Sequence, residues 1–178
     1  SLEYPENVDT LILSNPAAAN DRSHMKMLET KNQRYTPEKL AQINQLMQSK
    51  AFTEGDISTF KQLITLVEGV NAYDEQRMPF ILSGLQYTQE SMKRTIQISE
   101  LSRHFFDRYD LLPTLGNISA ETLIIHGDAD SIPLSSDEAI ASSMPNAKLV
   151  RLRESGHYPF AEQSAEFFKI IRAFLAPN

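Results

Sequence analysis

The sequence predicts an α/β fold with about three parallel strands, flanking helices and a large helical insertion. Short runs typical of strands occur at residues 9–14, 121–126 and 147–152. Residues 17–117, between the first two runs, hold most of the Met and Gln and little β-branched alternation, which favours helices. Strands that are separated by helices imply parallel pairing with right-handed crossovers.

The three predicted strands differ in their expected burial. Asp9–Ser14 is a continuous apolar run that Asn15-Pro16 ends, a pattern typical of a strand buried on both faces. Glu121–His126 has the same character and is the second buried strand. Ala147–Leu152 alternates polar and apolar residues, which suits an edge or half-exposed position.

The insertion is predicted to be a lobe of about four helices. Thr36 is a good N-cap for a helix over residues 36–47, in which Pro occupies the first helical position. Asp56 is a suitable N-cap for a second helix over residues 56–73. A third and less regular helical pattern runs over residues 89–106.

Two further helices complete the predicted sheet portion. Residues 135–144 form a short helix, and residues 164–175 carry one apolar stripe that can pack on a sheet face. We therefore expect residues 1–16 and 118–178 to form the sheet portion, and residues 17–117 to form the helical lobe.

Composition and charge exclude several classes of protein. The 178-residue chain has a net charge of −6, so we expect no nucleic acid as a partner. It has no Cys, which excludes disulfides, a thiol nucleophile and a thiolate metal site. The sequence shows neither an apolar run of about 18 residues nor a signal peptide, so we expect no membrane span and a cytoplasmic location.

Two short segments near the end of the chain carry groups for acid–base chemistry. The first follows the strand at residues 121–126 and offers Asp130, with Asp128 as the alternative. The second, at residues 154–160, offers His157. An imidazole exchanges protons near neutral pH, and a carboxylate can hold it in one tautomer. We therefore predict Asp130 and His157 as a catalytic acid and base, against the alternative roles of turn former and local backbone cap.

These segments resemble the C-terminal half of an α/β-hydrolase. His126-Gly-Asp-Ala-Asp-Ser-Ile-Pro133 is similar to the acid turn of that family, and Gly156-His-Tyr-Pro-Phe160 is similar to its histidine loop. The resemblance implies a partial α/β-hydrolase fold in which residues 17–117 are the cap. Within that family the acid turn is most similar to the proline-iminopeptidase-like group, although this chain lacks the Trp that those peptidases often carry in the cap. The implied function is cleavage of an ester or amide bond in a small molecule or short peptide.

The nucleophile of the predicted relay is absent from these 178 residues. The family's Gly-x-Ser-x-Gly motif needs two glycines four residues apart, and no two glycines have that spacing. We therefore expect a C-terminal fragment of a longer hydrolase that is inactive alone and self-associates through the exposed edge of the strand at residues 9–14. The alternatives are an Asp nucleophile, as in epoxide hydrolases and dehalogenases, and a non-catalytic binding or assembly module.

Other candidate residues are interpreted as structural. His126 ends a buried strand, and His24 and His104 have no second ligand at metal spacing, so we expect no metal site and no cofactor. Five methionines could line a pocket beneath the cap, but methionines at such positions more often only pack in the core. Four acidic residues could hold a substrate amine, but such residues more often form a solvated helix face. The methionines are Met25, Met27, Met47, Met78 and Met92, and the acidic residues are Glu54, Glu68, Asp74 and Glu75.

Overall fold

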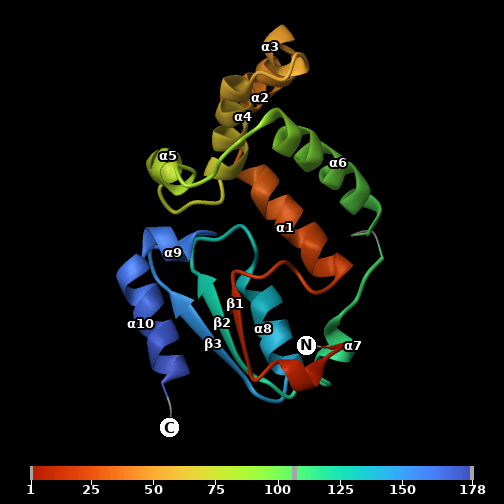
Figure 1. Cartoon of the computed structure of the whole chain (residues 1–178), viewed down its shortest axis with the longest axis vertical. Helices are drawn as coiled ribbons and strands as arrows, with labels where there is room; N and C mark the ends of the chain where they lie inside the picture. The colour runs from red at the N-terminus through yellow and green to blue at the C-terminus, as the bar shows by residue number, and fades with distance from the viewer. Residues whose placement is uncertain (1, 106–107, 177–178) are drawn as a thin grey trace.

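The computed structural model describes residues 2–105 and 108–176, and its centre is a three-stranded parallel sheet (Figure 1). The strands are β1 (Thr10–Ser14), β2 (Glu121–Gly127) and β3 (Ala147–Leu152), and they lie in the order β1-β2-β3. Both neighbouring pairs are parallel, as predicted. All three carboxyl ends therefore meet at one edge of the sheet, where open α/β sheets bind their ligands.

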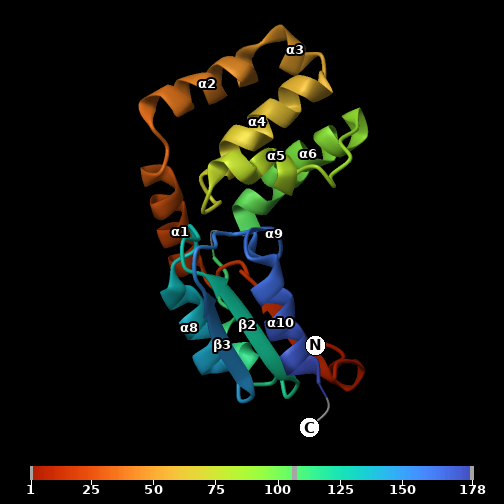
Figure 2. The ribbon, with the colours of Figure 1, turned by 90° about the vertical axis from the view of Figure 1, so that its left-hand side faces the viewer.

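Helices cover both faces of the sheet, because the side chains of β2 alternate between the faces. Ile124 packs with Ile140 of α8 (Leu134–Ser143), whereas Leu123 and Ile125 pack toward α10 (Ser164–Leu175). These three β2 side chains are at most 1% exposed. Figure 2 shows α8 and α10 on opposite sides of the sheet. The predictions of a buried second strand and of a final helix packed on the sheet are confirmed.

β1 is less buried than its sequence predicted. Leu11, Ile12 and Leu13 are only partly buried, although a continuous apolar run is typical of a strand that is covered on both faces. The reason is that β1 pairs only with β2 among the described residues, so its outer edge is open. β3, predicted as an edge or half-exposed strand, pairs in the described ranges only with β2.

In the described part of the chain, six helices lie between β1 and residue 106 and form a layer beyond the carboxyl edge of the sheet (Figure 1). We call them the cap helices. Thr36 and Asp56 accept hydrogen bonds from backbone N–H groups of the first turns that follow them, which confirms both predicted N-caps. The cap helices are α1 (Asp21–Gln33), α2 (Pro37–Gln48), α3 (Lys50–Thr53), α4 (Ile57–Gly69), α5 (Met78–Ile81) and α6 (Gln89–Phe105).

α7 (Leu112–Leu115) returns the chain to the sheet, where Leu115 packs in the same core cluster as Ile124. The remaining short elements are the 3-10 turns η1 (Pro5–Asn7) and η2 (Glu75–Arg77) and the one-turn helix α9 (Pro159–Glu162). No helix in the described ranges is long and apolar enough to cross a membrane.

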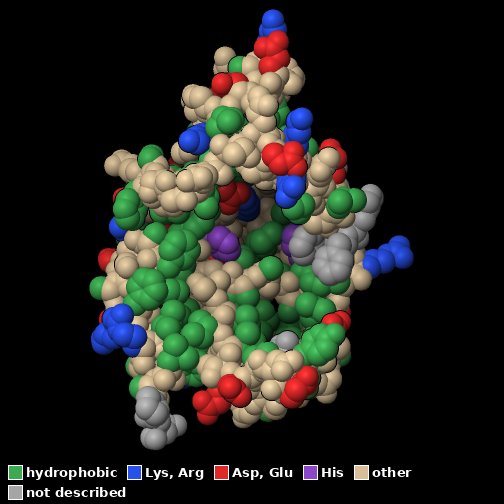
Figure 3. Space-filling model, viewed as in Figure 1, with side chains coloured by type: hydrophobic (Ala, Val, Ile, Leu, Met, Phe, Trp, Pro, Cys, Tyr) green, Lys and Arg blue, Asp and Glu red, His purple; other side chains and the backbone are tan. Residues whose placement is uncertain are grey.

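The surface is hollowed between the cap helices and the sheet portion (Figure 3). Histidine side chains and charges of both signs lie within or beside this hollow (Figure 3). The loops that follow β2 and β3 face this side of the sheet, so the predicted acid–base residues fall where cap and sheet meet.

Candidate active site

The site is built on two loops that lie against each other at the carboxyl edge of the sheet. Residues 128–133 of the acid turn follow β2, and residues 154–160, which we call the base loop, follow β3. The Ala129 N–H donates to the Ser155 carbonyl at 2.9 Å. Gly127 allows this contact, because a Cβ at that position would overlap the carbonyl oxygens of Gly156 and Ser155. Gly156 is confined in the same way by the backbone of Asn71 and Tyr73. The two glycines beside the predicted acid and base therefore let three backbone segments pack together.

Asp130 is placed by the acid turn with its carboxylate facing the base loop. Its N–H donates to the Gly127 carbonyl at 3.0 Å, and its Oδ1 accepts from the Ile132 N–H at 3.1 Å. The side chain is fully buried. A buried carboxylate needs several donors to remain charged, and the acid turn supplies one of them from its own backbone.

The structure brings Asp130 and His157 together. His157 Nδ1 lies 2.8 Å from Asp130 Oδ2. The imidazole is 34% exposed, and no described residue forms a hydrogen bond with its Nε2. Since a carboxylate can only accept, Nδ1 carries the hydrogen and Nε2 keeps a free lone pair. That is the arrangement of a general base with an orienting carboxylate.

The charges of the pair stabilise each other. Burial by itself raises the pKa of Asp130, but the hydrogen bond and charge of His157, the amide of Asn15 and the Ile132 N–H outweigh it and lower that pKa below its usual value. Burial by itself lowers the pKa of His157, but the hydrogen bond and charge of Asp130 outweigh it and raise that pKa above its usual value. Each side chain therefore stabilises the charged form of the other.

Asn15, the residue after β1, is a third member of the site that the sequence analysis did not single out. Its side-chain amide donates to Asp130 Oδ2 and, at 3.1 Å, to the Gly156 carbonyl. The residue is buried and has a left-handed backbone, with φ of 45°. Its position at the end of a strand, directly before a proline, is the sequence signal that could have identified it.

Two residues next to cap helices, Arg34 and Asn71, form hydrogen bonds with the acid turn and the base loop. Arg34, just after α1, donates to the carbonyls of Ala129 at 2.8 Å and Asp130 at 2.6 Å. Asn71, just after α4, accepts from the His157 N–H at 2.8 Å and from the Ser131 hydroxyl at 2.8 Å. No local sequence pattern marks either residue, because each reaches the site only through the tertiary fold.

The buried carboxylate of Glu162 accepts hydrogen bonds from the backbone of the base loop. Glu162 of α9 accepts from the N–H groups of Gly156 at 2.7 Å and Tyr158 at 3.2 Å, and from that of Tyr73 at 2.6 Å. Its two oxygens therefore join the base loop to the segment that follows α4. Three backbone donors satisfy this buried carboxylate without a cationic side chain.

Of the four acidic cap residues considered in the sequence, only Glu68 belongs to the site. Its carboxylate is 31% exposed and lies 3.4 Å from Lys31 Nζ, and it accepts from the Asn71 amide at 2.7 Å and from the Tyr158 hydroxyl at 3.1 Å. Burial and the charge of Glu68 raise the pKa of Tyr158 far above its usual value. The charge of Glu68 raises the pKa of His157, and that of Lys31 lowers it.

The other candidates lie outside this cluster. Asp128 is exposed and makes no hydrogen bond to His157, so the geometry favours Asp130 as its partner. His126 is buried and lies 2.9 Å from Asp137 Oδ2, in line with its structural interpretation. Met78 is fully buried and Met25 is 56% exposed, whereas Met47 and Met92 line a pocket that contains neither Asp130 nor His157 among its lining residues.

His24 stacks edge-to-face with Tyr109, and the side chain of His104 lies outside the described residues. Within the described ranges, no group of three or more His, Cys, Asp and Glu side chains could hold a metal ion.

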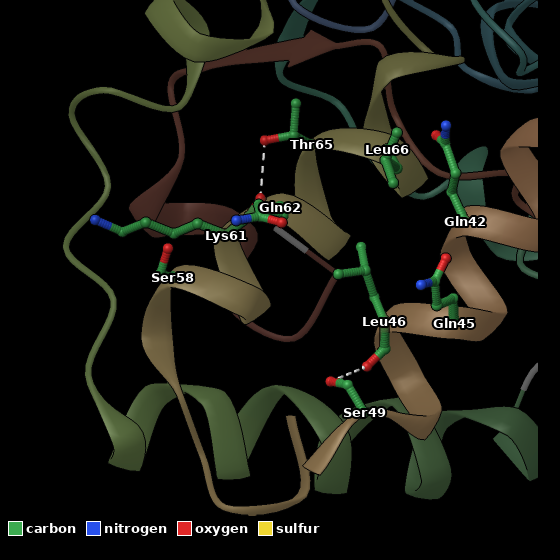
Figure 4. A pocket seen from close by; sticks show the side chains of 9 residues that line it. All are labelled: Gln42, Gln45, Leu46, Ser49, Ser58, Lys61, Gln62, Thr65 and Leu66. Carbon is green, nitrogen blue, oxygen red and sulfur yellow. Dashed lines mark hydrogen bonds between the residues drawn. The ribbon is translucent and has the colours of Figure 1, made fainter. Parts of the chain in front are cut away.

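A separate cavity of about 620 Å³ lies between α2 and α4 (Figure 4). Figure 4 shows side chains of both helices around it, including two leucines and three glutamines. None of its lining residues forms a hydrogen bond with Asp130 or His157. The lining residues are Gln42, Gln45, Leu46, Ser49, Ser58, Lys61, Gln62, Thr65 and Leu66.

Two curated proteins match almost the whole chain. The chain is 24% identical over 178 residues to 2-hydroxy-6-oxo-6-phenylhexa-2,4-dienoate hydrolase of Burkholderia cepacia. It is 25% identical over 182 residues to 2-hydroxy-6-oxononadienedioate/2-hydroxy-6-oxononatrienedioate hydrolase of Comamonas testosteroni. Each match covers 99% of this chain and 57% of the relative, so the chain spans little more than half the length of these proteins. No protein-family profile matches the chain.

Solved structures give the same picture of the fold. An α/β fold family hydrolase from Bacillus anthracis str. Sterne matches 98% of this chain and 61% of its own, with a TM-score of 0.66 and 19% identity. Proline iminopeptidase of Mycobacterium smegmatis matches 98% of this chain and 58% of its own, with a TM-score of 0.55 and 14% identity. Identities this low show the fold alone. The chain has a partial α/β-hydrolase fold, and it belongs to the α/β-hydrolase superfamily.

Proposed function

We propose that this chain is the cap and C-terminal part of a serine α/β-hydrolase, to which it supplies the acid and the base of a catalytic triad. The observation that carries the proposal is the 2.8 Å contact between His157 Nδ1 and buried Asp130 Oδ2, with Nε2 left unbonded among the described residues. A histidine that only capped local backbone would not need a buried carboxylate behind it and a free nitrogen in front of it.

In the proposed mechanism, His157 Nε2 takes a proton from the hydroxyl nucleophile as that oxygen attacks the substrate carbonyl. The imidazolium then returns the proton to the leaving group. Asp130 keeps the hydrogen on Nδ1 and stabilises the imidazolium, which agrees with the raised pKa of His157 and the lowered pKa of Asp130.

The nucleophile would come from sequence outside these 178 residues. The serines next to the pair in the chain are unsuitable as nucleophiles, since Ser131 and Ser155 are both buried and the Ser131 hydroxyl donates to Asn71 Oδ1. The outer edge of β1 is open among the described residues, and a strand that carries the nucleophile would pair there. A second copy of the chain would compete for the same edge, which keeps self-association as a proposal that analytical ultracentrifugation can test.

The substrate class remains a proposal with two members. The first is a small ester, an amide or a short peptide with a free amine, for which Glu68, the acceptor of the Tyr158 hydroxyl, is a suitable carboxylate. The second is suggested by the curated relatives, whose names describe 2-hydroxy-6-oxo acids. In such a compound the base would activate attack on a ketone, and the same Asp130–His157 pair would serve.

The decisive experiment starts from the full-length reading frame. We expect a Gly-x-Ser-x-Gly motif upstream of Ser1, covalent labelling of that serine by a fluorophosphonate probe, and turnover of p-nitrophenyl esters, amino acid p-nitroanilides or a 2-hydroxy-6-oxo-dienoate. His157→Ala should lower that turnover by about 10⁴-fold. Turnover by the isolated 178-residue chain that survives His157→Ala would contradict the proposal.

The same experiment separates the alternatives. An Asp in place of the serine of the upstream Gly-x-Ser-x-Gly motif, with turnover of epoxides or haloalkanes and no phosphonate labelling, would indicate an Asp nucleophile. A reading frame that starts near Leu2 and shows no turnover would indicate a non-catalytic module.

A further inference from the structure

Asn15 has an unusual backbone at the point where β1 meets the site. Its φ of 45° lies in the left-handed region, and its N–H donates to the Ile125 carbonyl of β2 at 2.8 Å. The residue is 4% exposed. Asn tolerates this conformation better than most residues, so the backbone alone would explain why Asn or Gly occupies the position.

The side chain of Asn15 has a task that the backbone does not require. Its Nδ2 donates both to Asp130 Oδ2 and to the Gly156 carbonyl, and since both partners can only accept, the orientation of the amide is fixed. Its Oδ1 is buried without a hydrogen-bond partner among the described residues. A buried polar atom left unpaired is unfavourable, so the two hydrogen bonds of Nδ2 must offset that free-energy cost.

We propose that Asn15 is a positioning residue that fixes the Asp130 carboxylate on His157 and so selects the imidazole tautomer with the hydrogen on Nδ1. Asp130 Oδ2 accepts from His157 and from Asn15, and Oδ1 accepts from the Ile132 N–H. Donors on both oxygens prevent the carboxylate from rotating about its Cβ–Cγ bond.

The second hydrogen bond of the amide extends this control to the base. Gly156, whose carbonyl accepts from Asn15, is the residue directly before His157. One side chain on β1 therefore holds both the acid turn after β2 and the base loop after β3. The inference uses the proposed roles of Asp130 and His157, but the tautomer can be measured without turnover.

The test is ¹⁵N NMR of the His157 ring in the 178-residue chain with Asn15→Gly and Asn15→Ala. Both variants delete the amide, but only Ala is strained at a φ of 45°. If the amide positions Asp130, both variants should shift the neutral tautomer ratio away from Nδ1–H by a similar factor of roughly 3 to 10. If Asn15 serves only the turn, Asn15→Gly should keep the wild-type ratio, and that result would overturn the proposal.

Two controls complete the test. Asn146→Ala removes another side-chain amide, which donates to the Ser119 carbonyl at 2.7 Å near the amino ends of β2 and β3. This variant should leave the His157 tautomer unchanged. In the wild-type chain, which needs no variant to fold, the Asn15 side-chain protons should exchange slowly with solvent and shift as His157 titrates. Exchange as fast as that of an exposed Gln would contradict the proposal.

Discussion

The molecule contains two His–Asp pairs of nearly the same geometry in very different surroundings. His157 and Asp130 meet at 2.8 Å where the cap helices and the sheet portion adjoin, whereas His126 and Asp137 meet at 2.9 Å inside the sheet portion. The ring of His157 is 34% exposed, but that of His126 is 3% exposed. A His–Asp contact therefore does not by itself identify a catalytic pair.

The carboxylates show what the surroundings change. Asp130 has hydrogen-bond donors on both oxygens, and its pKa is lowered. The Oδ1 of Asp137 is buried without a partner among the described residues, and burial raises the pKa of Asp137 despite the hydrogen bond of His126. One pair is thus prepared to hold charge beside an open nitrogen, while the other joins β2 to α8 inside the core.

The largest expected effect separates the two histidines. In the full-length protein, His157→Ala should lower kcat by about 10⁴-fold, because it removes the proposed base, and should cost less stability than His126→Gln, because Asp130 keeps the donors of Asn15 and Ile132. His126→Gln should do the reverse, with a loss of about 3 kcal/mol in the free energy of unfolding, because it leaves Asp137 buried without its partner. Steady-state kinetics and urea unfolding of both variants measure the contrast, and a catalytic loss in His126→Gln as large as in His157→Ala would erase it.

The next prediction concerns Gly127, which lies in the acid turn directly after His126. Gly127→Ala should lower the free energy of unfolding by about 3 kcal/mol, because the new Cβ would overlap backbone carbonyls of the base loop that cannot move aside cheaply. Gly84→Ala is the matched control, since no atom lies within 4 Å of its added Cβ. That control should be neutral or stabilising by up to ~1 kcal/mol. Equal unfolding midpoints for the two variants would show that the loops are not packed as described.

The pH dependence of stability should also distinguish the pairs. The raised pKa of His157 contributes stability that is complete below 6.5 and is lost as pH rises through the folded-state pKa. The lowered pKa of Asp130 contributes stability that is present above 3.8 and is lost as pH falls through its folded-state value. The stability difference between wild type and His157→Gln should therefore be largest between pH 3.8 and 6.5.

Asp137 should behave with the opposite sign to Asp130. Its raised pKa contributes stability below 3.8 that is lost as pH rises. Unfolding of wild type, His157→Gln and Asp137→Asn from pH 3 to pH 9 measures both trends. In the active full-length protein, the acid limb of kcat should lie above pH 6.5, because the base must be neutral. An acid limb below that value would contradict the raised pKa.

The smallest expected effects come from the cap. Glu68→Gln should move the acid limb of the pH profile to lower pH, and Lys31→Met should move it to higher pH, because these charges raise and lower the pKa of His157 respectively. Both side chains are partly exposed, so the shifts should shrink with added salt and change activity at the optimum by less than about threefold. NMR titration of the His157 ring measures both shifts, and a shift in the same direction in the two variants would contradict the prediction.

The sequence predicts the acid–base pair better than it predicts the pair's supports, and the reason is physical. Asp130 and His157 lie on short loops directly after strands, so their local patterns predict where they meet. Asn15, Arg34 and Asn71 contact the pair from other parts of the chain, and no local periodicity records such contacts.

Two other differences between sequence and structure are the burial of β1 and the presence of α1. The burial of β1 depends on a neighbouring strand rather than on its own apolar run. α1 was not predicted because its sequence is mostly polar and offers only a few apolar residues to mark a helix face, although Asn20 is a good N-cap and accepts from the Ser23 N–H.

The contacts of Arg34 and Asn71 have a consequence for anyone who recombines hydrolases. Caps are attractive units to exchange, because they are inserted between two strands and line the entrance to the site. In this chain, the junctions of the cap also hold the acid turn by two backbone carbonyls and the base loop by the His157 N–H. A chimera with a foreign cap would lose these contacts to the acid turn and the base loop, so the graft should keep Arg34 and Asn71.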